Sequence, residues 1–467
     1  MNKSIQLLLG AGVFISMGSQ SINAQVKGGI TPDMMNQIRS SYHATPTNRA
    51  LGNAIRNVSI QDIAKNSDGH IKLDNFFSDE VKSKGITNQK SSGRCWLFSG
   101  LNVLRAKMID KYNLDAFKFS QAYTFFYDQL EKSNLFLQGV IDTSDKDMDD
   151  KMVEWLFKHP LSDGGQFTGV SDLINKYGVV PSEVMPETYS TDNTRTMARL
   201  ISLKLKEYAL ELRQMAKEKK TDEVIEARKT DMLGVVYKML VLNIGEPPTH
   251  FTYTLRDVDG KVISSGEYTP KSFFDKFLGE DLTHDYVMLM NDPTRPFGKL
   301  YEIDYDRHVY DGYNWTYVNL PIDQIKKMAI ASIKDNSMMY FSCDVGKAFS
   351  REDGTLDLDN FDYSDLFGVK FGMNKRQRIA TFSSGSSHAM TLMAVNLVDG
   401  KPTKWKVENS WGEGPNDGHL IISDQWFDAY MFRLVVNKKY ITDETKSILK
   451  QKPIRLPAWD PMFADEE

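Results

Sequence analysis

The chain has 467 residues, of which 41% are hydrophobic and 25% charged, a composition that suits a soluble globular protein with a sizeable core. A chain of this length is expected to form roughly two or three domains or one elaborated fold. The formal net charge of −5 argues against a general nucleic-acid binder, which would need a strong positive field.

Residues 1–24 are predicted to be a signal peptide. Lys3 gives a positive start, residues 5–17 form an apolar core, and Ile22-Asn23-Ala24 resembles a small-residue cleavage site. This apolar core is too short to span a bilayer, and no later segment has the length of a membrane helix. The first cysteine is Cys95, so none lies near the cleavage site to carry a lipid anchor. We therefore expect an exported protein, periplasmic or secreted, that does not enter the membrane.

Residues 25–190 are rich in helical patterns and are predicted to form a mainly helical lobe. Within them, Cys95 lies at the expected start of a helix whose apolar stripe is Leu97, Leu101, Leu104 and Met108. A thiol is a useful nucleophile only as its thiolate, and the unpaired N–H groups of a helix's first turn stabilise that anion. Cys95 is therefore a candidate nucleophile. The alternative is a buried cysteine that packs as a small hydrophobe.

Gln89 lies six residues before Cys95 and can take part in the same chemistry. Acyl transfer passes through a tetrahedral oxyanion, which needs hydrogen-bond donors aimed at it. The side-chain amide of Gln89 and the backbone N–H of Cys95 can supply two such donors. Taken alone, a glutamine in a loop would indicate nothing.

The second half of the chain changes in character. Residues 191–235 form long, charged and nearly glycine-free helical sequence, and strand-like runs follow from about residue 250. We therefore predict a helical insertion over residues 191–275, with a possible role in oligomerisation, and a β-rich lobe over residues 276–467. A helical half followed by a strand-rich half points to an α+β fold.

The second cysteine, Cys343, lies in an apolar run, residues 337–345, that is predicted to be a buried strand. Two cysteines in an exported protein ordinarily suggest a disulfide. Such a bond would consume the thiol that the surroundings of Cys95 are suited to activate. We therefore expect two unlinked thiols, one functional and one that packs in the core.

A general base for Cys95 is predicted at His388, one of eight histidines. His388 opens an apolar strand that ends at a turn, Asp399-Gly400, and residues 404–411 return as a second strand. The midpoint of His388 and Asn409 falls next to that turn, so their side chains can meet across the hairpin. The Asn409 amide can then accept the ring N–H and fix the tautomer, while Trp411 shields the bond from water. A strand histidine or a buried asparagine taken alone is usually just structural.

Taken together, these segments resemble the papain superfamily and, more narrowly, the bleomycin hydrolase and aminopeptidase C family. The resemblance extends over most of the chain that follows residue 24. It is carried by these motifs: Asn88-Gln89-Lys90-Ser91-Ser92-Gly93-Arg94-Cys95-Trp96, Asp163-Gly164-Gly165-Gln166, Lys176-Tyr177-Gly178-Val179-Val180-Pro181, His388-Ala389-Met390, Glu408-Asn409-Ser410-Trp411-Gly412 and Leu456-Pro457-Ala458-Trp459-Asp460-Pro461-Met462.

The resemblance implies a papain-like two-lobe fold with a helical insertion, and a role for each site residue. It makes Cys95 the nucleophile, His388 the base, Asn409 its orienter and Gln89 the oxyanion donor. Gly164 and Gly165 would let the substrate backbone approach closely and form hydrogen bonds. No cofactor is implied.

The resemblance also implies a hexamer whose C-terminal tail lies in the cleft, where the terminal carboxylate holds the free amino group of the substrate. This chain departs from the family after Pro461-Met462, because it ends in Phe463-Ala464-Asp465-Glu466-Glu467 instead of a glycine and a short apolar tail. The added acids either strengthen capture of an amino group or keep the tail in solvent, as a frayed terminus would.

Other catalytic chemistries find little support in the sequence. The chain has no His-Glu-x-x-His motif or paired-cysteine spacing for zinc, and it has no Gly-x-Ser-x-Gly elbow. We therefore expect an exported cysteine peptidase, an aminopeptidase acting on peptides, with no metal and no nucleic-acid partner. An endopeptidase or dipeptidyl peptidase on the same residues is one alternative. A non-catalytic oligomeric binding protein is the alternative of a different class.

Overall fold

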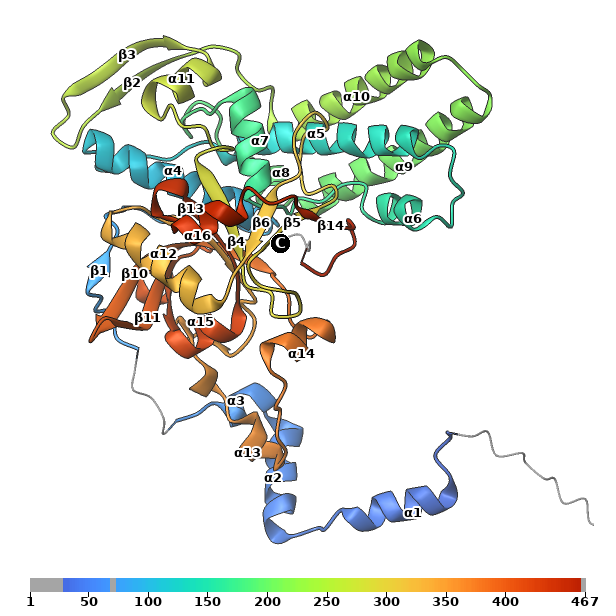
Figure 1. The fold of residues 1–467 in the computed structure, drawn as a ribbon, viewed down its shortest axis with the longest axis vertical. Helices are drawn as coiled ribbons and strands as arrows, with labels where there is room; N and C mark the ends of the chain where they lie inside the picture. Colours follow the sequence, from blue (N-terminus) through green and yellow to red (C-terminus); the bar gives the residue numbers. More distant parts are fainter. Residues whose placement is uncertain (1–27, 68–72, 463–467) are drawn as a thin grey trace, which may run out of the picture. The chain divides into compact units, whose positions relative to one another are not determined.

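The computed structural model describes residues 28–67 and 73–462, and the chain divides into two compact units after Ala64. The predicted signal peptide lies outside the described residues, as does the acidic C-terminal segment 463–467. No helix in the described ranges is both long and apolar enough to cross a membrane. The first unit contains three helices, α1 (Pro32–Ser41), α2 (Pro46–Asn57) and α3 (Ile60–Ala64) (Figure 1).

The first part of the second unit is mainly helical, and its three longest helices, among the described residues, lie side by side (Figure 1). Helix α5 packs against α4, α6, α7, α9 and α10. Ser120 accepts a hydrogen bond from the N–H of Tyr123 and so caps α5 at its N-terminus. The helices of this group are α4 (Cys95–Tyr112), α5 (Gln121–Asp142), α6 (Lys151–Lys158), α7 (Phe167–Tyr177), α8 (Tyr189–Asp192), α9 (Arg195–Lys217) and α10 (Asp222–Ile244).

Helix α4 lies at the centre of this unit, where it packs against the sheet strands β7 (Met339–Cys343) and β10 (His388–Val398) as well as against α5 and α7. Its residues are buried on all sides through most of its length, so the predicted apolar stripe is one part of a fully enclosed helix. Gly100 allows a neighbouring helix to approach closely, because a Cβ there would lie 2.4 Å from a side-chain carbon of Val170. The helix that carries Cys95 is therefore rigidly held.

One mixed sheet of 12 strands follows in the described part of the chain, and three of its strand pairings are parallel. Strand β1 (Asp79–Glu80) pairs with β10 off the main path. In spatial order the other strands are β14 (Ile454–Leu456), β5 (Lys299–Ile303), β6 (Thr316–Asn319), β4 (Tyr286–Met290), β13 (Met431–Asn437), β7, β10, β11 (Lys401–Glu408), β12 (His419–Ser423), β9 (Thr355–Leu356) and β8 (Phe349–Ser350).

Smaller elements complete the second unit. A separate hairpin joins β2 (Phe251–Arg256) to β3 (Val262–Tyr268), and α11 (Pro270–Phe277) packs against β3. The remaining helices are α12 (Ile322–Lys334), α13 (Tyr363–Phe367), α14 (Lys375–Ala380), α15 (Asp424–Tyr430) and α16 (Asp443–Ile448), with short 3-10 turns at Leu358–Asn360, Pro415–Gly418 and Lys438–Tyr440.

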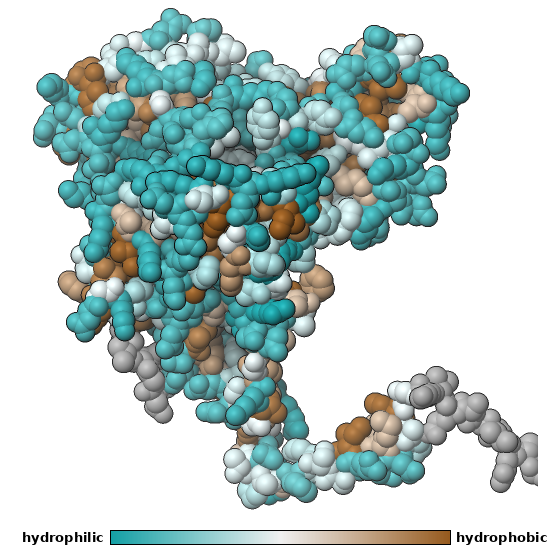
Figure 2. All heavy atoms as spheres, viewed as in Figure 1, coloured by the Kyte–Doolittle hydropathy of each residue, from teal (hydrophilic) through white to brown (hydrophobic). Residues whose placement is uncertain are grey.

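The α+β class predicted from the sequence is confirmed, and the strands predicted at residues 337–345, after His388 and at residues 404–411 are β7, β10 and β11. The charged stretch after residue 190 forms the antiparallel pair α9 and α10. This pair exposes apolar side chains among hydrophilic ones (Figure 2), including those of Leu200, Leu203, Leu210 and Leu242. The proposed domain boundaries at residues 190 and 275 stay predictions.

Candidate active site

Cys95 is the first residue of α4 and is fully buried. The preceding residue, Arg94, makes no side-chain capping hydrogen bond at this end of the helix. The backbone N–H of Ala389, the second residue of β10, donates to the Cys95 sulfur at 3.5 Å. Helix dipole and N–H donor both favour the thiolate form. The sulfur thus lies where the start of α4 meets the start of β10.

His388 and Asn409 are in direct contact, as the hairpin predicts. The distance from His388 Nε2 to Asn409 Oδ1 is 2.9 Å, and both residues are buried. The observed register pairs Thr391 with Glu408, which is two residues away from the register that the midpoint argument implies. The His388 and Asn409 side chains still touch, because residues placed diagonally across a hairpin are close enough for their side chains to meet. A bulge after Leu392 adds to the irregularity of the ladder.

The hydrogen bonds around Asn409 fix the tautomer of the neutral His388 ring. The backbone N–H of Ser410 also donates to Asn409 Oδ1, at 2.8 Å, so this atom is an acceptor. His388 Nε2 must then carry the hydrogen of the 2.9 Å contact, and Nδ1 is left as the acceptor. Burial lowers the pKa of His388 to about 4, against a smaller opposing effect of the Asn409 hydrogen bond. The ring is therefore neutral, and able to accept a proton, at pH 7.

Trp411 covers the imidazole. Its ring stacks on His388 with centroids 4.8 Å apart and an interplanar angle of 30°. The other side of Trp411 remains partly open to solvent, at 36% exposure. The stacked indole keeps water from the His388–Asn409 hydrogen bond, as the sequence predicts, and this exclusion strengthens the bond.

Gln89 lies beside this group because two backbone links join its loop to residues 410 and 411. Its N–H donates to the Ser410 carbonyl at 2.8 Å, and Asn88 forms a β-bridge with Trp411. The side-chain amide is oriented at both ends: Oε1 accepts from Ser410 Oγ at 2.6 Å, and Nε2 donates to the Ser92 carbonyl at 2.7 Å. A primary amide nitrogen has two hydrogens, so Nε2 keeps a second one for an oxyanion.

Gly164 and Gly165 lie in a buried loop between α6 and α7. The N–H of Gly164 donates to Ser162 Oγ at 2.9 Å, and its carbonyl accepts from the Lys132 ammonium. A Cβ at Gly165 would lie 2.5 Å from a ring carbon of His308, so packing alone requires a glycine there. These contacts explain the structural role of the two glycines. Their role in binding substrate stays a prediction.

Three charged side chains near the site, Arg105, Glu408 and Asp163, were given no role from the sequence. Arg105 of α4 and Glu408 of β11 form a buried ion pair at 2.5 Å, directly beside Asn409. Burial raises the pKa of Glu408, and the Arg105 guanidinium opposes that rise. Asp163 accepts from the N–H of Gly93 at 2.8 Å and so anchors the loop before Cys95. The only sequence signal was position, since Glu408 and Asp163 flank Asn409 and Gly164.

Cys343 is buried in β7, where it pairs with His388 across the sheet. Both cysteines belong to the described part of the chain, and no disulfide joins them. The prediction that Cys343 packs in the core is confirmed. Within the described ranges, no group of three or more His, Cys, Asp or Glu side chains is arranged to hold a metal ion.

Known proteins similar to this chain were found by sequence and by structure. The model of the Peptidase C1-like family matches residues 29–463. Aminopeptidase C of Lactobacillus delbrueckii subsp. lactis is 37% identical over 441 residues, which cover 93% of this chain and 98% of that protein. Bleomycin hydrolase of Mus musculus is 40% identical over 394 residues, or 82% of this chain and 86% of that protein. The crystal structure of pepw from Lactobacillus rhamnosis superposes with a TM-score of 0.91 at 40% identity, and the match covers 94% of this chain and 99% of that one.

Proposed function

Because the chain belongs to the Peptidase C1-like family, and is a papain-like cysteine peptidase, we propose that it is an aminopeptidase that removes residues from the N-termini of peptides. The relatives named aminopeptidase C and bleomycin hydrolase support this activity. The observation that carries the proposal is the hydrogen bond from His388 Nε2 to Asn409 Oδ1, which leaves Nδ1 as the basic atom of the ring, while the backbone N–H of the next residue, Ala389, donates to the sulfur of Cys95.

The reaction begins with proton transfer from the Cys95 thiol to His388 Nδ1. The thiolate attacks the carbonyl carbon of the first peptide bond, and the oxyanion receives hydrogen bonds from the Cys95 N–H and from Gln89 Nε2. The C–N bond breaks as His388 returns its proton to the leaving amine, and a thioester remains on Cys95. His388 then accepts a proton from water, which attacks the thioester and releases the amino acid.

One assay tests both the mechanism and the exopeptidase mode. Matched peptides with free and acetylated N-termini are digested by the wild type and by Cys95→Ala, with Cys343→Ala as the control for loss of a thiol. We expect cleavage of the free peptide alone, by the wild type and the control. Equal cleavage of both peptides would identify an endopeptidase. Activity that survives Cys95→Ala would refute the mechanism, and a wild type with no activity would leave the binding-protein alternative.

The acidic tail is proposed to restrict the enzyme to N-termini by holding the amino group of the substrate. The residues just before the tail are held in place by two contacts. Asp460 forms an ion pair with Arg295 at 2.5 Å, and the carbonyl of Met462 accepts a hydrogen bond from the buried Arg433. Deleting residues 465–467, which lie outside the described residues, is expected to permit cleavage of the acetylated peptide. If the deletion leaves the preference for free N-termini intact, the tail has no such role.

Export and assembly complete the proposal. Cleavage of the signal peptide predicts a mature protein that begins at Gln25, which N-terminal mass spectrometry of the protein from fractionated cells would detect.

A hexamer, implied by resemblance, is supported by the exposed leucines of α9 and α10. Light scattering of the purified protein measures its mass directly, and a monomer would refute the assembly.

A further inference from the structure

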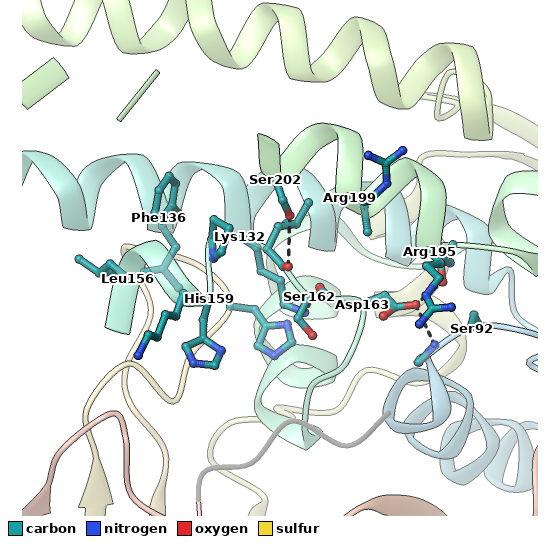
Figure 3. A pocket seen from close by; sticks show the side chains of 18 of the residues that line it. Ser92, Lys132, Phe136, Leu156, His159, Ser162, Asp163, Arg195, Arg199 and Ser202 are labelled. Carbon is teal, nitrogen blue, oxygen red and sulfur yellow. Dashed lines mark hydrogen bonds between the residues drawn. The ribbon is translucent and has the colours of Figure 1, made fainter. Parts of the chain in front are cut away.

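A cavity of about 1090 Å³ lies beside the loop that precedes Cys95, between α5, α6 and α9. Figure 3 shows Ser92, Asp163 and Arg195 toward one end of it and Leu156, Phe136 and His159 toward the other. Neither Cys95 nor His388 lines this cavity. Its volume is at the upper end of the range found for small-ligand sites, so it admits a complete side chain with its bound water.

The cavity wall is strongly positive although the whole protein carries a net charge of −5. Among the described residues, Asp163 is the single acidic residue in the wall, and its carboxylate already accepts from the Gly93 N–H and the Thr194 hydroxyl. The wall also contains seven cationic side chains: Lys90, Lys132, Lys158, Arg195, Arg199, Lys206 and Arg307. A concave wall of one sign concentrates its field on whatever enters.

Helix α9 supplies three of these cations from one face. Arg195, Arg199 and Lys206 are spaced by four and by seven residues, and Ser202 between them also lines the cavity. The salt bridges of the described residues pair Lys132 with Asp128 and Lys158 with Glu154. They include none for Lys90, Arg195, Arg199 or Lys206. Four cations of the wall therefore have no carboxylate of the described chain to balance them.

Two buried hydrogen-bond donors of the wall, one neutral and one cationic, also indicate an anionic ligand. Gln166 is 1% exposed and lines the cavity, and its Nε2 has no hydrogen-bond partner among the described residues, while its Oε1 accepts from Tyr317. Arg307 Nε is likewise buried and makes no hydrogen bond to the described part of the chain. Buried donors without acceptors are costly, and an anion would satisfy them.

The cavity adjoins the start of the helix that carries Cys95. Its Ser92 and Gly93 come directly before Arg94 and Cys95, and the N–H of Ser91 donates to the carbonyl of Asp192, just before α9, at 2.9 Å. His388 is stacked under Trp411 and does not line the cavity. A substrate residue whose carbonyl carbon reaches the Cys95 sulfur therefore lies next to the cavity.

We propose that this basic cavity binds an acidic side chain at the N-terminus of the peptide substrate, so that the enzyme preferentially removes glutamate and aspartate. The inference rests on the proposed aminopeptidase activity and specifies its substrate class. The carboxylate of the substrate pairs with Arg195 and Arg199, while the Gln166 amide supplies a neutral donor.

Two peptides that differ only in their first residue, Glu or Gln, test the preference. We expect the wild type to show a kcat/KM about tenfold higher for the Glu peptide, a ratio typical of one charge-assisted contact. Added salt is expected to reduce the ratio, because the interaction is electrostatic. Equal values for the two peptides would overturn the inference and leave the aminopeptidase proposal intact. Failure to cleave either peptide would instead overturn the aminopeptidase proposal.

Paired charge variants locate the effect. The double variant Arg195→Gln/Arg199→Gln is expected to bring the Glu-to-Gln ratio close to one, because it removes the two guanidinium groups that pair with the carboxylate of the Glu peptide. The matched control, Lys217→Gln/Lys219→Gln, removes the same charge from the far end of α9 and should keep the ratio. A ratio unchanged in the first variant, or a preference that appears only when residues 465–467 are deleted, would contradict the inference. The latter result would mean that the acidic tail of the chain fills the cavity.

Discussion

The proposed catalytic group and the basic cavity share one loop, residues 91–93, but they differ in how their polar side chains are held. Each of His388, Asn409 and Gln89 is oriented by a side-chain hydrogen bond within the chain. Around the cavity, the Nε2 of Gln166 has no partner among the described residues, and the salt bridges of those residues include none for Arg195, Arg199 or Lys206. The catalytic residues keep their geometry without a ligand, because the chain itself holds them. The cavity donors have no such partners, and a bound anion would supply them.

The largest effect on stability is expected from removing one partner of the ion pair beside the catalytic residues. Arg105→Ala leaves Glu408 as a buried carboxylate without its cation, which costs about 3–5 kcal/mol of unfolding free energy. Denaturant titration measures the loss. In the double variant Arg105→Met/Glu408→Gln, both charges are removed and the loss should be smaller. A single variant as stable as the wild type would show that the pair does not support the site.

A smaller effect is expected from the orienting amide. Asn409→Ala removes the acceptor that fixes the His388 tautomer, and kcat/KM should fall about 10²-fold while the fold is retained. Asn396→Ala, on the same hairpin but distant from the site, serves as the control and should leave kcat/KM unchanged. A decrease below twofold for Asn409→Ala would mean that His388 is oriented by other contacts.

The pH profile tests the burial of His388. Its pKa of about 4 keeps the ring neutral down to acidic pH, so the acid limb of kcat/KM should lie near pH 4 instead of near the ordinary value of 6.5. The same depression makes unfolding pH-dependent: the stability from this group is present above pH 6.5 and is lost as the pH falls through 4. An acid limb near pH 6.5 would show an open, hydrated imidazole.

The smallest effect is expected on the cavity side. Arg199 is exposed and pairs with no carboxylate of the described chain, so Arg199→Gln should change the melting temperature by less than about 1 °C. Calorimetry compares the melting temperatures of Arg199→Gln and Arg105→Ala, and so distinguishes a charge that serves binding from one that stabilises the fold. A clear loss of stability in Arg199→Gln would show that the cavity cations also hold the fold.

The sequence predicted the parts of the site that depend on local pattern or on one hairpin. Cys95 at a helix start follows from the spacing of apolar residues, and His388 with Asn409 follows from one turn. The register was wrong by two residues, because the turn Asp399-Gly400 sets the pairing and its centre lies one position after the midpoint of His388 and Asn409; the two irregularities in the ladder offset each other. The contact was still correct, since two long side chains tolerate a diagonal placement.

Features that depend on distant parts of the chain could not be predicted. Gly165 is required by His308, which lies 143 residues further along the chain and packs against it only in the folded protein. The cations of α9 were predicted only as part of a long, charged helical stretch over residues 191–235, because their order along the chain does not show what that helix faces. Only the packing of α9 near α5 and the loop at Asp163 gathers them around one cavity.

Trapping the acyl-enzyme tests the central claim most directly, namely that Cys95 attacks the first peptide bond of a substrate with a free amino terminus. The wild type is mixed with a free or an acetylated peptide ester, quenched in acid within milliseconds, digested and analysed by mass spectrometry. The account predicts the mass of one aminoacyl group on the fragment that contains Cys95, from the free ester alone. An adduct on Cys343 or another residue, or equal labelling by the acetylated ester, would contradict it.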